Sequence, residues 1–344
     1  MHYGTKLGLL ILVLTLSACH SPGPVKKAAA FYHWQTRFAV DSLESTYLDH
    51  LEVTQLYVKF FDIDWDGGRK ELVPQATLEL TDSDSLSVKT IIPCIFITNR
   101  SFQHSSPAQQ EDLVGRVIQR VQYLQNQFPD GVVFPALQLD CDWTASTRDA
   151  YFRFLSQLKE KLEALNCELS VTIRLHQLAD PSGTGVPPAD HGVLMFYNMG
   201  DLTSWEEPNS ILNLTASIPY LKPKAYPLSL DLALPIYSWG VLFRDGQMIQ
   251  LINDLQPETL LESSDFKMLS PTRFIVTKST YLKGQYVYKN DLIRVEAPVL
   301  EDLQRALPLL EPIFKKRAYT IILYHLDAAL LKTTPYAQLE ALFY

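Results

Sequence analysis

Two aspartates, Asp140 and Asp142, stand two residues apart at the end of the apolar segment of residues 132–140. In a β-strand, residues two apart point to the same face, so the two carboxylates would project together. A carboxylate pair of this kind can carry a catalytic proton, because each charge raises the pKa of the other group. The same residues also suit a solvated strand end or a helix N-cap, so both interpretations stay open at this stage.

The elements that would position this pair follow a regular pattern along the chain. Apolar segments of strand length alternate with helical patterns or loops, which is typical of a parallel α/β sheet or barrel. Eight such segments occur, at residues 30–34, 55–61, 91–98, 132–140, 169–175, 193–197, 230–237 and 319–324. The clearest helices are predicted at residues 107–127 and 147–165, where apolar side chains recur every three or four positions.

About eighty residues separate the seventh and eighth segments, which is far more than one crossover helix needs. We therefore predict an α/β fold, a (β/α)8 TIM-type barrel with an α+β insertion between strands 7 and 8. The barrel domain is predicted to cover residues 30–344, with the insertion at about 241–317. Within the insertion we predict a helical piece at 248–255, a small β element from 274–278 and 285–288, and a helix at 300–314.

The N-terminal residues have the layout of an export signal. Lys6 precedes an apolar run of roughly ten residues, which is too short to span a bilayer comfortably. The run ends in Leu16-Ser17-Ala18-Cys19, which resembles a bacterial lipobox. We expect residues 1–18 to be a lipoprotein signal peptide and residues 19–29 to be a lipidated Cys19 and a tether. The protein would then be a membrane-anchored lipoprotein of the bacterial cell envelope, facing the periplasm or the exterior. An ordinary cleaved signal that ends near a cysteine is the alternative.

Composition limits the classes of partner. The chain has 344 residues, of which 47% are hydrophobic, so it can bury a large core. Its net charge of −8 argues against a nucleic-acid partner. Cys94, Cys141 and Cys167 show neither metal-ligand spacing nor a disulfide framework. We expect a monomer without metal or cofactor, whose membrane contact comes from the N-terminal lipid anchor.

The predicted strand ends combine aromatic rings with carboxylates and amides. In a TIM barrel the active site is built at these C-terminal ends. Aromatic faces stack on sugar rings and polar groups bind hydroxyls, so we predict a groove for a glycan or polysaccharide. The predicted substrate-binding residues are Trp34, Asp62, Asp64, Asn99, Trp143, Arg174, His176, Asn198, Tyr237, Trp239 and Tyr324. For each aromatic residue, core packing is the alternative; for Arg174, it is an ion pair with Asp140 and Asp142.

Three of these strand ends resemble the chitinase-like barrels of glycoside hydrolase family 18. Residues 137–144 resemble the family's D-x-x-D-x-D-x-E, Met195-Phe196-Tyr197-Asn198 resembles its M-x-Y-D or F-Y-N, and Pro235-Ile236-Tyr237 resembles its P-x-Y. The motifs follow one another in the family's order. The resemblance implies a glycoside hydrolase barrel in which a glutamic acid protonates the leaving oxygen. A neighbouring acid and a tyrosine, here Tyr197, hold the substrate's N-acetyl group.

Two departures from the motif argue against that reaction. Leu137 replaces its first acid, and Thr144 stands at the position of the catalytic glutamate. Because a threonine hydroxyl cannot donate a proton at a useful pKa, the usual chitinase mechanism is not expected. The chain is then a degenerate or divergent glycoside hydrolase, with Asp142, Asp140 and Tyr197 as catalytic candidates. The alternative is a non-catalytic lipoprotein that binds glycans or acts as a scaffold.

If an enzyme remains, Asp142 is the expected acid or base, and Asp140 is the like-charged neighbour that would raise its pKa. A second carboxyl group would have to come from another strand, and Asp62 and Asp64 are the candidates. A polar turn is the alternative for these two residues.

Overall fold

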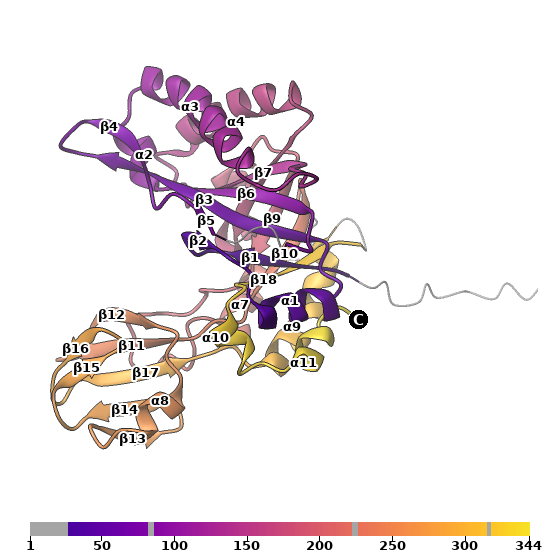
Figure 1. The fold of residues 1–344 in the computed structure, drawn as a ribbon. Coiled ribbons are helices and arrows are strands. Elements are labelled where there is room, and N and C mark those ends of the chain that lie inside the picture. The colour runs from indigo at the N-terminus through magenta and orange to yellow at the C-terminus, as the bar shows by residue number, and fades with distance from the viewer. Residues whose placement is uncertain (1–26, 82–85, 222–225, 315–317) are drawn as a thin grey trace, which may run out of the picture.

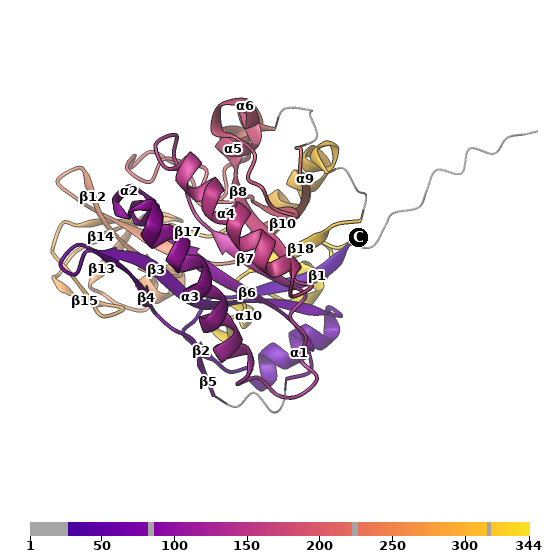
Figure 2. The same ribbon diagram turned by 90° about the horizontal axis from the view of Figure 1, so that it is seen from above.

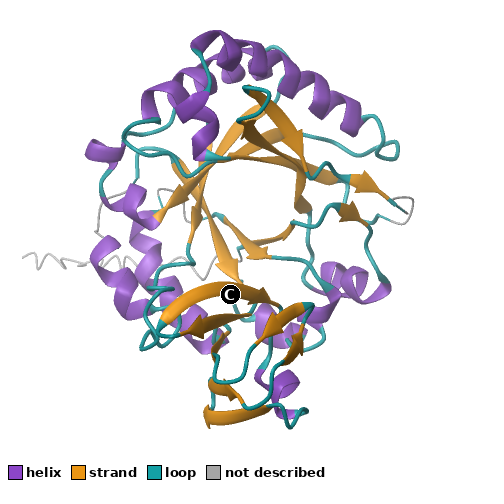
Figure 3. Cartoon of the chain, turned by 90° about the vertical axis from the view of Figure 1, so that its left-hand side faces the viewer, coloured by secondary structure: helices purple, strands orange, loops and turns teal. Residues whose placement is uncertain are grey.

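The computed structural model describes residues 27–81, 86–221, 226–314 and 318–344 (Figure 1). The predicted signal peptide, Cys19 and most of the tether therefore lie outside the described residues. Eight parallel strands form a closed ring, because β1 pairs with β18 on one side and with β3 on the other. The barrel strands are β1 (Ala28–His33), β3 (Gln55–Asp66), β6 (Thr90–Ile97), β7 (Ala136–Asp140), β8 (Glu168–Arg174), β9 (His191–Met195), β10 (Ser229–Pro235) and β18 (Thr320–Tyr324). The predicted (β/α)8 fold class is confirmed, and Figure 3 shows the ring of strands with helices around it.

Side-chain alternation divides the barrel strands into two apolar faces. Phe31 and Leu139 belong to the core between strands and outer helices, whereas Tyr32 and Tyr57 point into the barrel. The barrel interior also holds polar groups that bond one another. The hydroxyl of Tyr32 donates to Oε1 of Gln138 at 2.6 Å, and both side chains are fully buried. Side chains such as these fill the barrel interior and pack beneath the strand ends.

Two long helices cover the outer face near β7, as the apolar periodicity predicts (Figure 2). Helix α3 (Pro107–Gln125) begins with a capping box between Ser106 and Gln109, and α4 (Arg148–Glu163) follows the Asp140 segment. The segment between β3 and β6 is different. Among its described residues there is no helix: β4 (Glu71–Gln75) pairs antiparallel with the end of β3, and β5 (Glu79–Leu80) pairs with β2 (Arg37–Phe38).

The insertion between β10 and β18 contains a five-stranded antiparallel sheet with its own apolar core (Figure 1). Its strands are β11 (Trp239–Arg244), β12 (Gln247–Asn253), β13 (Phe266–Ser270), β14 (Arg273–Val276) and β17 (Leu292–Glu296). A second hairpin, β15 (Thr280–Leu282) with β16 (Gln285–Val287), and helix α8 (Pro257–Leu261) complete it. Helix α9 (Leu300–Leu310) then leads back to the barrel.

The helical piece predicted at residues 248–255 was wrong, because those residues lie largely in strand β12. Asp245 and Gly246 both have positive φ, at 50° and 77°, and form a tight turn between β11 and β12. An Asp-Gly pair is a strong hairpin signal, so the sequence did contain the information that the apolar spacing obscured.

The remaining elements are short. They are α1 (Ser42–His50), α2 (Asn99–His104), α5 (Leu175–Ala179), α6 (Pro181–Thr184), α7 (Leu214–Ser217), η1 (Ile218–Tyr220), η2 (Glu311–Ile313), α10 (Ala328–Leu331) and α11 (Tyr336–Glu340). None of the helices formed by the described residues is long and apolar enough to cross a membrane.

Candidate functional site

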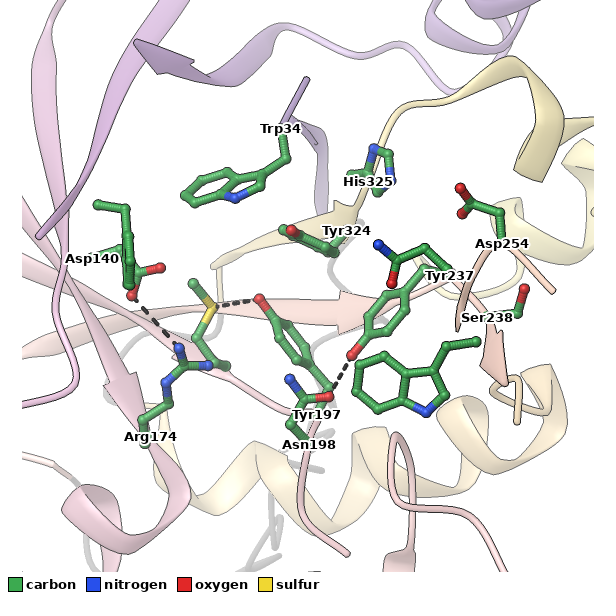
Figure 4. A pocket seen from close by; sticks show the side chains of 14 residues that line it. Trp34, Asp140, Arg174, Tyr197, Asn198, Tyr237, Ser238, Asp254, Tyr324 and His325 are labelled. Atoms are coloured by element: carbon green, nitrogen blue, oxygen red, sulfur yellow. Dashed lines mark hydrogen bonds and ion pairs between the residues drawn. The ribbon is translucent and has the colours of Figure 1, made fainter. Parts of the chain in front are cut away.

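A cleft opens at the C-terminal ends of the barrel strands, with a cavity of about 320 Å³ (Figure 4). It is lined by Trp34, Phe96, Asp140, Arg174, Met195, Tyr197, Asn198, Tyr237, Ser238, Trp239, Asn253, Asp254, Tyr324 and His325. Asp140 and Arg174 lie at one end of the cavity, and Ser238 and Asp254 lie at the other. Barrel strands and the insertion therefore share the lining.

Arg174 holds the two aspartates together at one end of the cleft. It is the last residue of β8, next to β7, and its Nε lies 2.6 Å from Oδ1 of Asp142. Its Nη2 lies 3.7 Å from Oδ1 of Asp140. The hydroxyl of Thr172 also donates to this Asp140 oxygen, at 2.7 Å. The carboxylates do project to one side, as predicted from their spacing.

The two acids differ in how far their side chains are buried. The side chain of Asp142 is 56% exposed, whereas that of Asp140 is 9% exposed. Burial raises the pKa of the Asp140 carboxyl, although the nearby Arg174 charge opposes the shift. The buried position thus belongs to Asp140, whereas Asp142, which the sequence favoured as acid or base, is exposed because it stands beyond the end of the strand.

A group of tyrosines forms one wall of the cleft. Tyr197 and Tyr237 are buried, and their rings meet edge to face with centroids 6.0 Å apart. The Tyr237 hydroxyl donates to Oδ1 of Asn198 at 2.5 Å, and the Tyr197 hydroxyl donates to the sulfur of Met195 at 3.1 Å. Tyr324 packs against both rings. Burial raises the pKa of Tyr197 far above that of a free tyrosine, so its hydroxyl stays neutral and can donate a hydrogen bond.

The insertion contributes Trp239 to the same wall. Its indole Nε1 donates to Oε2 of Glu296 at 2.7 Å, and Ser210 donates to the same oxygen. Arg294 pairs with the other carboxylate oxygen of Glu296 at 2.6 Å, and both charged side chains are fully buried. This network fixes the tryptophan at the junction of barrel and insertion.

A second cavity of about 330 Å³ adjoins the first, because both are lined by Arg174, Tyr197 and Asn198. The second cavity adds Asp142 and the exposed His176 to the site. The two cavities therefore lie next to each other, with Arg174, Tyr197 and Asn198 between them.

Four predicted substrate-binding residues, Asp62, Asp64, Asn99 and Trp143, do not line either cavity. Trp143 is buried against α4, and its indole donates to the carbonyl oxygen of Thr184 at 3.0 Å. Alternation explains this placement, since Trp143 shares the outward face with Leu139 and Cys141. Asn99 instead accepts a hydrogen bond from the Thr147 hydroxyl at 2.5 Å.

Asp64, another of these residues, pairs with Arg100 beside the barrel end, with Nε 2.6 Å from Oδ1. The hydrogen bond from Arg100 lowers the pKa of Asp64 to about 2. Asp62 pairs with Lys59 instead, at 3.3 Å, and does not line the described cavities. Burial raises the pKa of Asp62. Asp62 and Asp64, which were predicted to supply a second carboxyl group, therefore each form an ion pair with a different cation.

Thr144 does not take part in the cleft. Its hydroxyl lies 2.9 Å from that of Ser146 and 3.3 Å from that of Thr147, in the exposed turn before α4. No carboxylic acid thus occupies the position that the motif assigns to the proton donor.

Several lining residues were missing from the predicted set. Ser238, Asn253 and Asp254 reach the cleft from the insertion, and the incorrect helix at 248–255 concealed the last two. His325 directly follows the eighth strand, and this strand-end position, already visible in the sequence, places it in the lining. Within the described ranges, no three His, Cys, Asp or Glu side chains gather as a metal site would require.

Comparison with solved structures identifies the architecture. The cortex-lytic enzyme SleL of Bacillus megaterium superimposes with a TM-score of 0.55 over 94% of this chain and 76% of its own, at 14% identity. A class V chitinase from Pseudomonas fluorescens has a TM-score of 0.55 over 92% of this chain and 100% of its own, at 13% identity. A chitinase from Chromobacterium violaceum has a TM-score of 0.51 over 92% of this chain and 98% of its own, at 12% identity. This chain has the fold of the chitinase-like TIM barrels. No protein-family profile and no curated protein sequence matches it.

The TIM-barrel fold accounts for the position of the cleft at the C-terminal ends of the strands. Asp140 ends β7 and Asp142 follows two residues later, while Met195 ends β9 and Tyr197 follows two residues later.

Proposed function

We propose that this protein binds a carbohydrate chain in its barrel cleft without cleaving it by the chitinase route. The ion pair between Arg174 and Asp142 supports this proposal most directly. Because Arg174 contacts Asp142 through Nε at 2.6 Å and Nη2 at 3.3 Å, the oxygens of the accessible acid are engaged by the guanidinium. Thr144 cannot replace that acid as a proton donor.

The rest of the cleft suits sugar recognition. Trp34, Tyr237 and Trp239 provide apolar ring surface, while Asn198 and Ser238 provide groups that bond hydroxyls. Two adjoining cavities of about 320 and 330 Å³ favour an oligosaccharide over a single sugar.

A second candidate function, hydrolysis by a different acid, is supported by Asp140. Burial raises the pKa of this carboxyl, which faces the cleft, and a raised pKa suits a general acid. Product analysis separates this candidate from simple binding.

Binding by the purified protein should be measured calorimetrically with a panel of oligosaccharides, and the products should be analysed by chromatography. We expect at least one glycan to bind without release of smaller fragments. Trp34→Ala should weaken that binding about tenfold, because a stacking surface is lost. Asp142→Asn should retain most of the affinity, and Asp149→Asn, on the exposed surface of α4, is the matched control.

Each outcome bears on one claim. Fragments released by the wild type but not by Asp140→Asn would replace the binding proposal with hydrolysis. Failure of the whole panel to bind would remove carbohydrate as the ligand class.

We further propose that the barrel is exported and held at a bacterial membrane through a lipid on Cys19. Leu16-Ser17-Ala18-Cys19 supports this proposal. When the full chain is expressed in a bacterium, mass spectrometry should find a diacylglyceryl group on Cys19, and the protein should sediment with membranes. Cys19→Ala should release the protein or leave an uncleaved precursor. An unmodified, cleaved N-terminus in the wild type would contradict lipidation.

A further inference from the structure

Three exposed tyrosines lie side by side on the β15–β16 hairpin of the insertion. Tyr281 stands directly opposite Tyr286 in the hairpin, and Tyr288 follows two residues later on the same face. The ring centroids are 5.0 Å apart in both neighbouring pairs. The three residues, here called the tyrosine strip, are 73%, 43% and 50% exposed.

The opposite face of the hairpin is buried, so the tyrosine strip must face outward. Leu282 and Val287 are buried in the apolar core of the insertion. The hairpin therefore cannot turn its tyrosines inward without exposing that core. In Figures 1 and 2 the hairpin lies at the end of the insertion away from the barrel. None of the strip residues lines either cavity of the cleft.

Three lysines lie near the strip along the chain, in residues 277–290, while Asp291, the next residue after this segment, pairs with Arg244. Lys278, Lys283 and Lys289 are all exposed, and residues 277–290 contain neither aspartate nor glutamate, although the whole chain carries a net charge of −8. Arg244 lies over the Tyr288 ring, 4.3 Å from its centroid, and its pairing with Asp291 at 2.8 Å holds it there. The hairpin is thus a local basic and aromatic surface on an acidic protein.

This combination favours a hydrated polyanion built of rings. Sugar rings stack against exposed aromatic side chains, and acidic substituents pair with lysines. A lipid bilayer is less suitable, because membrane-binding surfaces insert exposed aliphatic or large apolar side chains. The only aliphatic side chains in residues 277–290 are Leu282 and Val287, and both are buried.

We propose that the tyrosine strip and its three lysines form a second binding surface, separate from the cleft, for an acidic polysaccharide. The surface would hold a charged polymer of the protein's surroundings while the cleft stays free. This inference does not depend on which ligand the cleft takes.

Polygalacturonate, a polymer of uronic acids, is a suitable probe, with dextran as the neutral polymer. We expect the purified protein to bind polygalacturonate at about 50 mM salt and to lose at least tenfold in affinity at about 500 mM, because the lysine contacts are screened. Replacing Lys278, Lys283 and Lys289 together with alanine should weaken binding about tenfold. Replacing the three tyrosines with alanine should have an effect of similar size, since stacking is lost.

Control variants distinguish binding at the tyrosine strip from a general effect of the protein's net charge. Alanine at Lys89, Lys161 and Lys332 removes the same charge from exposed positions elsewhere and should leave affinity within about twofold. Tyr123→Ala removes an exposed ring outside the insertion. Unchanged thermal midpoints would show that the strip variants still fold.

An equal loss of affinity in the two triple-lysine variants would overturn the proposal. Equal affinity for dextran and polygalacturonate would also overturn it. Binding to phosphatidylglycerol vesicles with none to the polymer would assign the surface to a membrane instead.

Discussion

Replacing Arg294 with methionine is expected to lower the free energy of unfolding by about 3–5 kcal/mol. The arginine side chain is fully buried, and its Nε donates to Oε1 of Glu296 at 2.6 Å. A second nitrogen donates to the carbonyl oxygen of Ser204. Without the guanidinium, the buried Glu296 carboxylate would lose its only paired cation among the described residues. Uncompensated charge in a low-dielectric interior is the main cost.

The same substitution should also affect the cleft. Glu296 accepts the indole hydrogen bond of Trp239, so a carboxylate that moves toward solvent would take the tryptophan with it. Urea denaturation followed by circular dichroism measures the first effect, and oligosaccharide titration measures the second. The double variant Arg294→Met/Glu296→Leu should recover much of the stability, because no charge is then left buried.

Arg305→Met is the matched control for this experiment. Arg305 is 71% exposed and pairs with Asp302 on the surface of α9, so its loss should cost well under about 1 kcal/mol. An Arg294→Met protein that is as stable as this control would show that the buried pair does not hold insertion and barrel together.

Acid is expected to destabilise the protein through His33. This residue ends β1 and is 2% exposed, with its ring packed against Phe38 at 4.8 Å. Burial, helped by the neighbouring His325, lowers the pKa of His33 to about 4. In the unfolded chain the histidine pKa is about 6.5. The folded state thus favours the neutral ring, and its contribution is fully present above pH 6.5 and is lost as pH falls towards 4.

The size of this effect follows from the difference in pKa, which corresponds to about 3 kcal/mol. We expect His33→Leu to have nearly wild-type stability at pH 7.5, since Nδ1 of His33 has no hydrogen-bond partner among the described residues. Between pH 6.5 and 4 the variant should lose about 3 kcal/mol less than the wild type. Urea midpoints across this range give the comparison.

His104→Gln is the control, because His104 is exposed on α2. This variant should follow the wild-type pH profile. Parallel profiles for wild type and His33→Leu would show that His33 is not protonated on unfolding as we infer.

The sequence alone was sufficient for the barrel and for the pairing of its acids. Each apolar segment was long enough for one buried strand, and the period of two places Asp140 and Asp142 on one side. The same period of two, applied to Trp143, would have predicted that its side chain lies in the core. Its aromatic character favoured the groove in our prediction, although alternation already assigned it to the face of Leu139 and Cys141.

Only the tertiary structure decided what surrounds those acids. Periodicity specifies which face of its own strand a side chain occupies, but it does not specify which distant element packs against that face. Arg174 was ambiguous in sequence and became the partner of both aspartates because β8 pairs with β7. Trp239 and Glu296 meet across 57 residues, through a sheet whose pairing depends on long-range contacts. The chain's local patterns therefore determined its barrel and the order of its strand ends, while packing between distant elements determined which of those residues became a cleft.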